Sequence, residues 1–267
     1  MKPHADDVPG GAEPPLGLAL WLVSLLASLC WAGIVLGGLL PGSGAAALVP
    51  ADAAVPHSLA WHVAQLTLMF LAWAGLCTAL MLPLAGRAAL LFARLAGEGS
   101  ARSTPPYHNP RTTRFVLGYI GTWTGFALLA AIVHWSLHES GPAGLYPSTL
   151  RHPALIGLAL VAAGLYQWTP VKHACLEHCR APYTGILSGW RDAPDQPAWR
   201  GAAHAWQCLG SCWLLMLVLL AAGPDNPAAV TAVGLLVLAE IRLAAGHWVA
   251  CAGGLALLAL GTLLLFP

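Results

Sequence analysis

Long apolar runs, separated by short polar segments, dominate this chain. Seven of them reach roughly 17–25 residues, enough for a helix to cross the hydrocarbon core of a bilayer. They are residues 16–40, 58–82, 114–137, 153–169, 205–222, 228–244 and 247–266. The pattern predicts an all-α, polytopic transmembrane helical bundle of about seven helices, forming a single domain over residues 16–267.

The sequence leaves the number of spans open at the C-terminal end, and it gives separate expectations for the N-terminal end. Only a short Ala-Ala-Gly turn separates the last two runs, so they could form a re-entrant pair, which gives six spans instead of seven. The first 15 residues are acidic and rich in Pro and Gly, and we expect a disordered tail there. The run at 16–40 is too long for the core of a signal peptide, so we expect it to stay as the first helix.

The composition also indicates a membrane protein. Hydrophobic residues make up 58% of the chain and charged residues only 9%, against about 25% charged residues in soluble domains. A net charge of +1 gives no reason to expect a nucleic-acid partner. The sequence carries no nucleotide-binding or hydrolase motif, so nucleotide-driven pumping would need a partner chain.

The basic residues predict the orientation. Eleven of the twelve Lys and Arg residues, including Lys172 in the predicted loop after the fourth span, fall on one side of the predicted spans, and only Arg151 falls on the other. Since cytoplasmic loops carry the excess of basic residues, we expect a cytoplasmic N-terminus, in a bacterial inner membrane.

One segment, YQWTPVKHACLEHCRAP at 166–182, concentrates soft ligand types at the cytoplasmic side. Thr169 followed by Pro170 is typical of a helix start. In that helix Cys175, His178 and Cys179 share one face, and His173 points nearly the opposite way. Thiolate and imidazole suit copper, which we favour, or zinc.

Two further groups lie at the same predicted depth. His204, Cys208 and Cys212 form one stripe at i, i+4 and i+8, and His247 and Cys251 form a pair. We take the first stripe as candidate additional metal ligands. The alternative is that these Cys and His residues only pack between helices.

The cysteine pattern argues against a disulfide framework. The chain has seven Cys residues, an odd number, and most lie in or beside apolar runs. On the cytoplasmic side thiols are kept reduced, so Cys175 and Cys179 should be available as ligands.

Three polar residues lie within the apolar runs. Glu240 either pairs with another group or stays solvated at the membrane interface. Gln65 and Gln167 could hydrogen-bond between helices.

The segment at 166–182 resembles the signature of the DUF2182 family, which is described as predicted metal-binding integral membrane proteins. The resemblance rests on Tyr166, Gln167, Thr169, Pro170, Lys172, Cys175, Leu176, His178, Cys179, Arg180 and Pro182. Weaker similarity lies at 117–130, 189–192, 208–226 and 235–242, so the likeness covers roughly residues 60–260. It implies a membrane-embedded helical fold and metal binding, and supplies no reaction.

The chain departs from the family pattern at several positions. The second span reads TALMLP, which keeps Met81 and Pro83 but lacks a neighbouring Met, and Asp225 stands where a Met is expected. His247 and Cys251 lie outside the pattern.

Three functions remain open from the sequence. The first is binding of a soft or borderline metal for handling or delivery, with a protein that donates or accepts the metal as a partner besides the lipid bilayer. The second is a membrane redox protein or oxidoreductase subunit that uses the same cysteines. The third is a structural subunit without metal.

Overall fold

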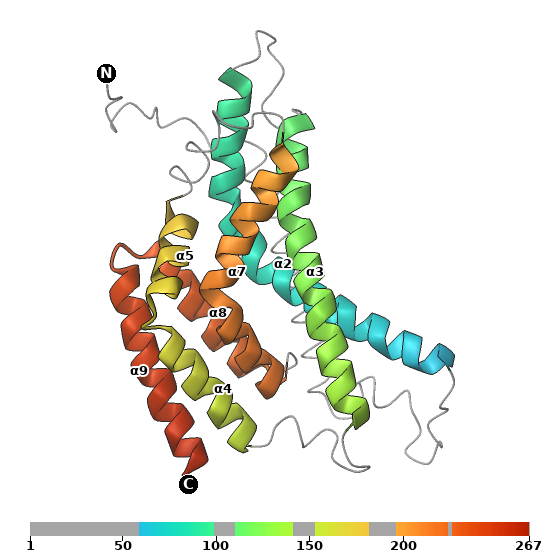
Figure 1. The fold of residues 1–267 in the computed structure, drawn as a ribbon, viewed down its shortest axis with the longest axis vertical. Coiled ribbons are helices and arrows are strands. Elements are labelled where there is room, and N and C mark those ends of the chain that lie inside the picture. The colour runs from blue at the N-terminus through green and yellow to red at the C-terminus, as the bar shows by residue number, and fades with distance from the viewer. Residues whose placement is uncertain (1–58, 99–109, 141–152, 182–195, 224–225, 267) are drawn as a thin grey trace.

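The computed structural model describes residues 59–98, 110–140, 153–181, 196–223 and 226–266. Within these residues all regular structure is helical, which confirms the predicted all-α class. The helices, shown in Figure 1, are α2 (Leu59–Glu98), α3 (Pro110–Ser140), α4 (Pro153–Tyr166), α5 (Pro170–Arg180), α7 (Pro197–Ala222), α8 (Pro227–Arg242) and α9 (Gly246–Leu265). The predicted tail and the predicted first span at 16–40 lie outside the described residues, so the domain boundaries stay a prediction.

Proline marks the start of five of these helices. A proline at the first helical position loses no hydrogen bond, and its fixed φ favours the helix. The predicted start of α5 is confirmed, because the Thr169 hydroxyl accepts a hydrogen bond from the Lys172 backbone N–H at 3.3 Å. Asn226 caps α8 in the same way, accepting from the N–H groups of Ala228 and Ala229.

Helix α2 is much longer than the predicted span at 58–82, because it continues to Glu98. In the extension Phe92 stacks on Phe115 of α3, with ring centroids 4.6 Å apart. Packing against α3 therefore maintains a helix where the apolar run ends. The helix bends partway along (Figure 1), and Pro83 within it cannot donate a backbone hydrogen bond.

Four described helices are long and apolar enough to cross a membrane: α2, α3, α7 and α9. The predicted span at 153–169 is instead a bent pair, since α5 turns away from α4 by 73°, and the two together could make a fifth crossing. Large apolar side chains such as Leu68, Leu129 and Leu263 are 60–68% exposed. Surfaces of this kind are covered by lipid in an integral membrane protein.

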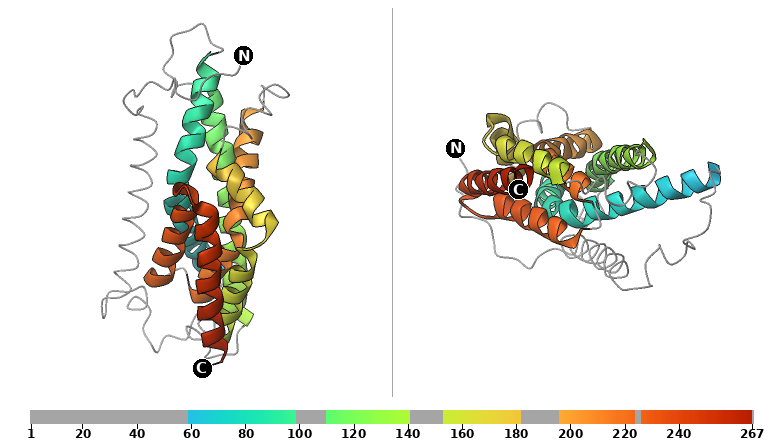
Figure 2. Two further views of the ribbon diagram at one scale, coloured as in Figure 1. Left: turned by 90° about the vertical axis from the view of Figure 1, so that its left-hand side faces the viewer. Right: turned by 90° about the horizontal axis from the view of Figure 1, so that it is seen from below.

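Helix α7 lies in the middle of the bundle and packs against α3, α4, α5 and α8. Figure 1 places the C-terminal end of α2 and the N-terminal ends of α3 and α7 at the same end of the molecule. Figure 2 shows the N-terminal part of α2 projecting from the side of the bundle. The shared end carries residues predicted to be cytoplasmic, but the direction across the membrane stays a prediction.

Two glycines allow α3 and α7 to approach closely. A Cβ on Gly118 would collide with the backbone carbonyl of Ala198, and one on Gly201 would collide with that of Phe115. Small residues at such crossings let membrane helices pack backbone to backbone. The contact fixes where the central helix crosses α3.

We expect Gly118→Ala and Gly201→Ala each to destabilise the fold by about 1–3 kcal/mol, because the new methyl group forces the two backbones apart. Thermal unfolding of the detergent-solubilised protein measures the loss. Gly125→Ala is the matched control on α3, since nothing lies within 4 Å of its Cβ position. Equal effects of all three substitutions would show that the crossing does not depend on these glycines.

Candidate metal centre

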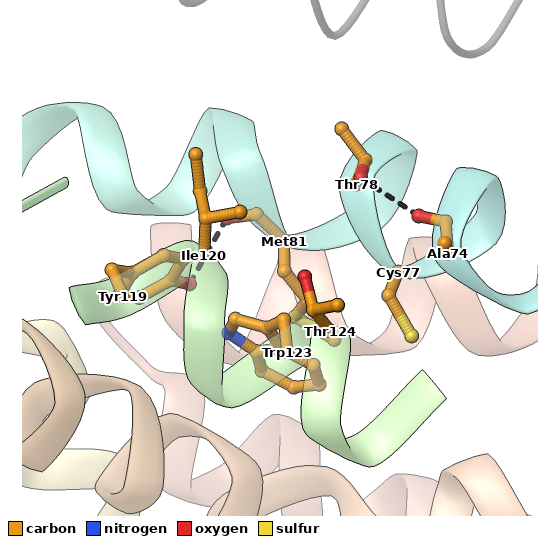
Figure 3. Close-up of a pocket in the computed structure, with 8 residues that line it drawn as sticks. All are labelled: Ala74, Cys77, Thr78, Met81, Tyr119, Ile120, Trp123 and Thr124. Carbon is orange, nitrogen blue, oxygen red and sulfur yellow. Dashed lines mark hydrogen bonds between the residues drawn. The ribbon is translucent and has the colours of Figure 1, made fainter. Parts of the chain in front are cut away.

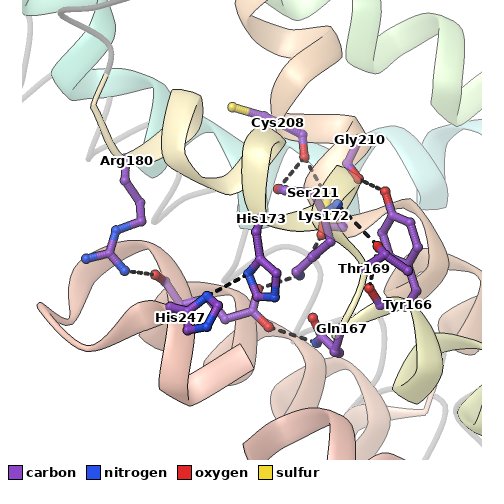
Figure 4. Close-up of polar contacts among 12 residues, drawn as sticks. Tyr166, Gln167, Thr169, Lys172, His173, Arg180, Cys208, Gly210, Ser211 and His247 are labelled. Carbon is purple, nitrogen blue, oxygen red and sulfur yellow. Dashed lines mark hydrogen bonds and ion pairs between the residues drawn. The ribbon is translucent and has the colours of Figure 1, made fainter. Parts of the chain in front are cut away.

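The hinge between α4 and α5 is fixed to the central helix by Tyr166. Its hydroxyl donates to the carbonyl of Gly210 at 2.6 Å, and its ring meets the Trp213 ring edge-on, with centroids 5.8 Å apart. Figure 4 shows this contact beside Thr169, where α5 begins. The start of the ligand-rich helix therefore has a defined position against α7.

A buried ion pair holds α5 between α7 and α8. The Lys172 ammonium lies 2.6 Å from a Glu240 carboxylate oxygen. It also donates to the carbonyl of Ser211 at 2.6 Å, and Figure 4 shows Lys172 beside Ser211. The side chains of Lys172 and Glu240 are 0% and 2% exposed. The charge pattern predicts a position in a cytoplasmic loop for Lys172. The bend after α4 instead directs its side chain into the bundle.

Both carboxylate oxygens of Glu240 have a hydrogen-bond partner. Its second carboxylate oxygen accepts a hydrogen bond from the Gln167 side-chain amide at 2.8 Å, which confirms the predicted interhelical role of Gln167. The alternative of a solvated Glu240 is wrong, because the residue is 1% exposed. The side-chain carbonyl oxygens of Gln65 and Gln167 have no hydrogen-bond partner among the described residues, and the predicted interhelical role of Gln65 stays a prediction.

The far end of α5 is fixed by Arg180, whose guanidinium closes the end of α8. It donates to the carbonyl of Glu240 at 2.9 Å, to that of Leu243 at 2.6 Å and to that of Ala244 at 3.0 Å. Carbonyls at a helix end lack partners within the helix, and a basic side chain satisfies them. Both ends of α5 are therefore held.

Held in this way, α5 brings one thiol to α7. Cys179 is 8% exposed and belongs to the same buried core as Cys208 and Cys212 of α7, near enough for the three thiols to influence one another electrostatically. The Cys208 sulfur lies 3.8 Å from Nε2 of His204. Cys179 is therefore the residue of the α5 group that lies beside the stripe on α7.

A fourth thiol, which the sequence analysis did not identify, joins this group. Cys77 of α2 is 1% exposed and interacts electrostatically with Cys212. We call Cys77, Cys179, Cys208 and Cys212 the buried thiol cluster. A cavity of about 140 Å³ adjoins it, lined by Cys77, Met81, Tyr119 and Trp123 among others (Figure 3).

The other two predicted ligands on α5 lie apart from the cluster. Cys175 is half-buried, beside Gly210, although it still interacts electrostatically with Cys179. His178 is exposed, and its Nδ1 lies 2.8 Å from the carbonyl of Ala174 in its own helix. A shared helix face therefore does not place all three ligands together.

A second group, which we call the surface triad, joins His173 of α5 to His247 and Cys251 of α9. The Nδ1 atoms of the two histidines are 3.0 Å apart (Figure 4), and the Cys251 sulfur is 4.0 Å from Nε2 of His247. One ligand atom from each residue lies within 4.8 Å of the others. As predicted, His173 faces away from the cysteines of α5. Its partner, His247, lies far from it in the sequence.

The two groups offer different coordination chemistry. Sulfur ligands in an apolar interior favour soft Cu(I), and a mixed imidazole–thiolate set also accepts borderline ions such as Zn²⁺. All six Cys residues in the described part of the chain are free, so each thiol is available as a ligand.

Residues 70–264 match the model of a protein family described as PpoB2, copper chaperone. The match covers the buried ion pair, the buried thiol cluster and the surface triad. Comparisons with curated proteins and with solved structures give no match.

We expect Lys172→Met and Glu240→Leu each to destabilise the protein by about 3–5 kcal/mol, because each leaves an unpaired charge in the interior. The double variant should recover part of this loss, since it removes both charges. Denaturant titration in detergent measures the effect, with Glu177→Gln on the exposed face of α5 as the control. Additive losses in the double variant would contradict a direct ion pair.

Thiol reactivity should follow burial. We expect a maleimide to modify half-buried Cys251 well before Cys208 and Cys212, which are 3% and 1% exposed. Mass spectrometry of peptides after timed labelling of the folded protein gives the order. If Cys208 reacted as fast as Cys251, the described burial of the thiol cluster would be wrong.

Proposed function

Because the chain belongs to the PpoB2 family of copper chaperones, we propose that it binds Cu(I) at the buried thiol cluster and passes it to a partner protein. The family, the apolar helices and the His/Cys grouping together fit a membrane protein that handles copper. The identity of the metal, its ligands and its partner are the parts that we propose.

The observation that carries the proposal is the burial of four thiols from three helices in one core. Among the described residues no three of these sulfurs lie within 4.8 Å of one another, so their side chains would have to draw together around an ion. Cys77 comes from α2, Cys179 from α5, and Cys208 and Cys212 from α7, and each is at most 8% exposed. Soft thiolates select Cu(I) over harder ions. The four residues lie in the buried core, so a bound ion is kept from water, and the Lys172–Glu240 pair lies close enough to act on Cys212.

The ends of the cluster suggest how copper reaches it. His204 lies beside Cys208 and interacts electrostatically with exposed His178, so these two imidazoles lead from the surface of α5 to the first buried sulfur. Successive ligands on α7 are one turn apart, a spacing that suits transfer by ligand exchange. We assign this route to the cytoplasmic side of a bacterial inner membrane, following the basic residues.

Cys175 completes the proposed ligand set as an alternate donor. It lies near Cys179 but beside Gly210, at the edge of a groove that Tyr166 and Trp213 also line. A thiol there can take part in exchange without belonging to the resting site.

We also propose that the chain is a member of the DUF2182 family. The resembling region, roughly 60–260, nearly coincides with the matched residues 70–264. The alternatives, a redox subunit and a structural subunit, are not better supported by the family or by the described geometry.

We expect the full-length protein, loaded with Cu(I) in detergent, to retain copper through gel filtration. Cys179→Ser/Cys208→Ser should lose the copper held by the cluster, because it removes sulfur from both sides of the α5–α7 contact. Mass spectrometry of bound metal gives the copper per chain, and Glu177→Gln is the control. An X-ray absorption spectrum of the wild type without copper–sulfur scattering would contradict the proposal.

A further inference from the structure

The surface triad is separate from the buried thiol cluster in both position and chemistry. His173 lies on the opposite face of α5 from Cys179 and contacts α9, whereas Cys179 contacts α7. The histidine rings have centroids 4.1 Å apart. His247 is exposed, and His173 and Cys251 are half-buried. The group is therefore open to the surroundings, unlike the thiols.

Its dimensions suit one metal ion. Two imidazole nitrogens that bind one ion at 2.0–2.1 Å with a tetrahedral angle are about 3.3 Å apart, and nearer 2.9 Å at a right angle. The observed separation of 3.0 Å falls in this range. One ligand atom of each of the three residues lies within 4.8 Å of the others, and the Cys251 sulfur is 4.0 Å from Nε2 of His247.

We propose that His173, His247 and Cys251 form a second metal site, which takes Cu(I) and exchanges it with a donor or acceptor protein. Three ligands complete a trigonal Cu(I) site and leave room for one incoming ligand. That ligand can bind before the protein's own ligands leave, so the ion is never released to water. The proposed function enters only in the choice of copper.

Contacts of neighbouring residues hold the helices that carry the triad in place. His173 follows Lys172, whose ammonium is held by Glu240 and Ser211. Arg180 closes the end of α8 just before the turn into α9. Two helices that are far apart in the sequence therefore present their ligands in register.

A hydrogen bond between the two imidazoles is the competing explanation, and it requires no role for Cys251. The test measures copper per chain for the full-length protein in detergent, by titration with Cu(I) against a chromogenic chelator. Four proteins are compared: wild type, His247→Leu/Cys251→Ala, Cys179→Ser/Cys208→Ser, and the combined variant. Leu255→Ala, on the exposed surface of α9 away from the triad, is the matched control.

We expect the wild type to bind one more copper than His247→Leu/Cys251→Ala. The copper that remains in Cys179→Ser/Cys208→Ser should show both nitrogen and sulfur ligands by X-ray absorption, and the combined variant should bind none. An unchanged stoichiometry in His247→Leu/Cys251→Ala overturns the triad site alone. An unchanged stoichiometry in Cys179→Ser/Cys208→Ser overturns the thiol cluster alone.

A variant on the other helix guards against misfolding of the α9 variant. His173→Gln keeps a polar side chain at a half-buried position and should also lose one copper. If this variant folds and keeps the wild-type stoichiometry, the triad site is overturned.

Discussion

The ion pair between Lys172 and Glu240 is the interaction on which the arrangement of this protein depends. Neither charge reaches water, so each is stable inside the bundle only while the other is in place. Lys172 comes from α5 and Glu240 from α8, and the carbonyl of Ser211 ties the pair to α7. A short helix that cannot span the membrane thereby acquires one defined position between α7 and α8.

In that position, two different faces of α5 carry candidate metal ligands. One face carries Cys179 to the buried core beside Cys208 of α7, where we propose the sulfur ligands of Cu(I). The other face carries His173 to His247 of α9, where the group is open. A chaperone must hold its ion firmly yet release it to a partner, and the proposed pair of sites, one buried and one exposed, would serve both requirements. Ligand exchange between protein groups would keep the ion from water throughout.

Much of the architecture could be predicted from the sequence. Apolar runs gave the helices and their approximate bounds, because length and hydropathy alone determine which segments fit a bilayer. The start of α5 followed from Thr169 and Pro170, whose capping chemistry is local. The sequence also identified Cys179, Cys208 and Cys212 by their helical spacing.

What the sequence could not reveal depends on tertiary contacts. Cys77 has no ligand-type residue close to it in the sequence other than Met81, so only the tertiary fold, in which α2 packs on α3, brings it near the thiols of α7. His173 belongs to the triad because α9 comes back beside α5. Lys172 read as a loop charge, since a bend of 73° between two helices leaves no pattern in hydropathy.

Crystals of the copper-loaded, full-length protein, measured at the copper absorption edge, test the account most directly. An anomalous difference map should show one peak among the sulfurs of Cys179, Cys208 and Cys212 and a second between His173 and His247. The Lys172–Glu240 pair should be intact in the same map. Copper peaks bound to other residues, with none beside α5, would contradict the account.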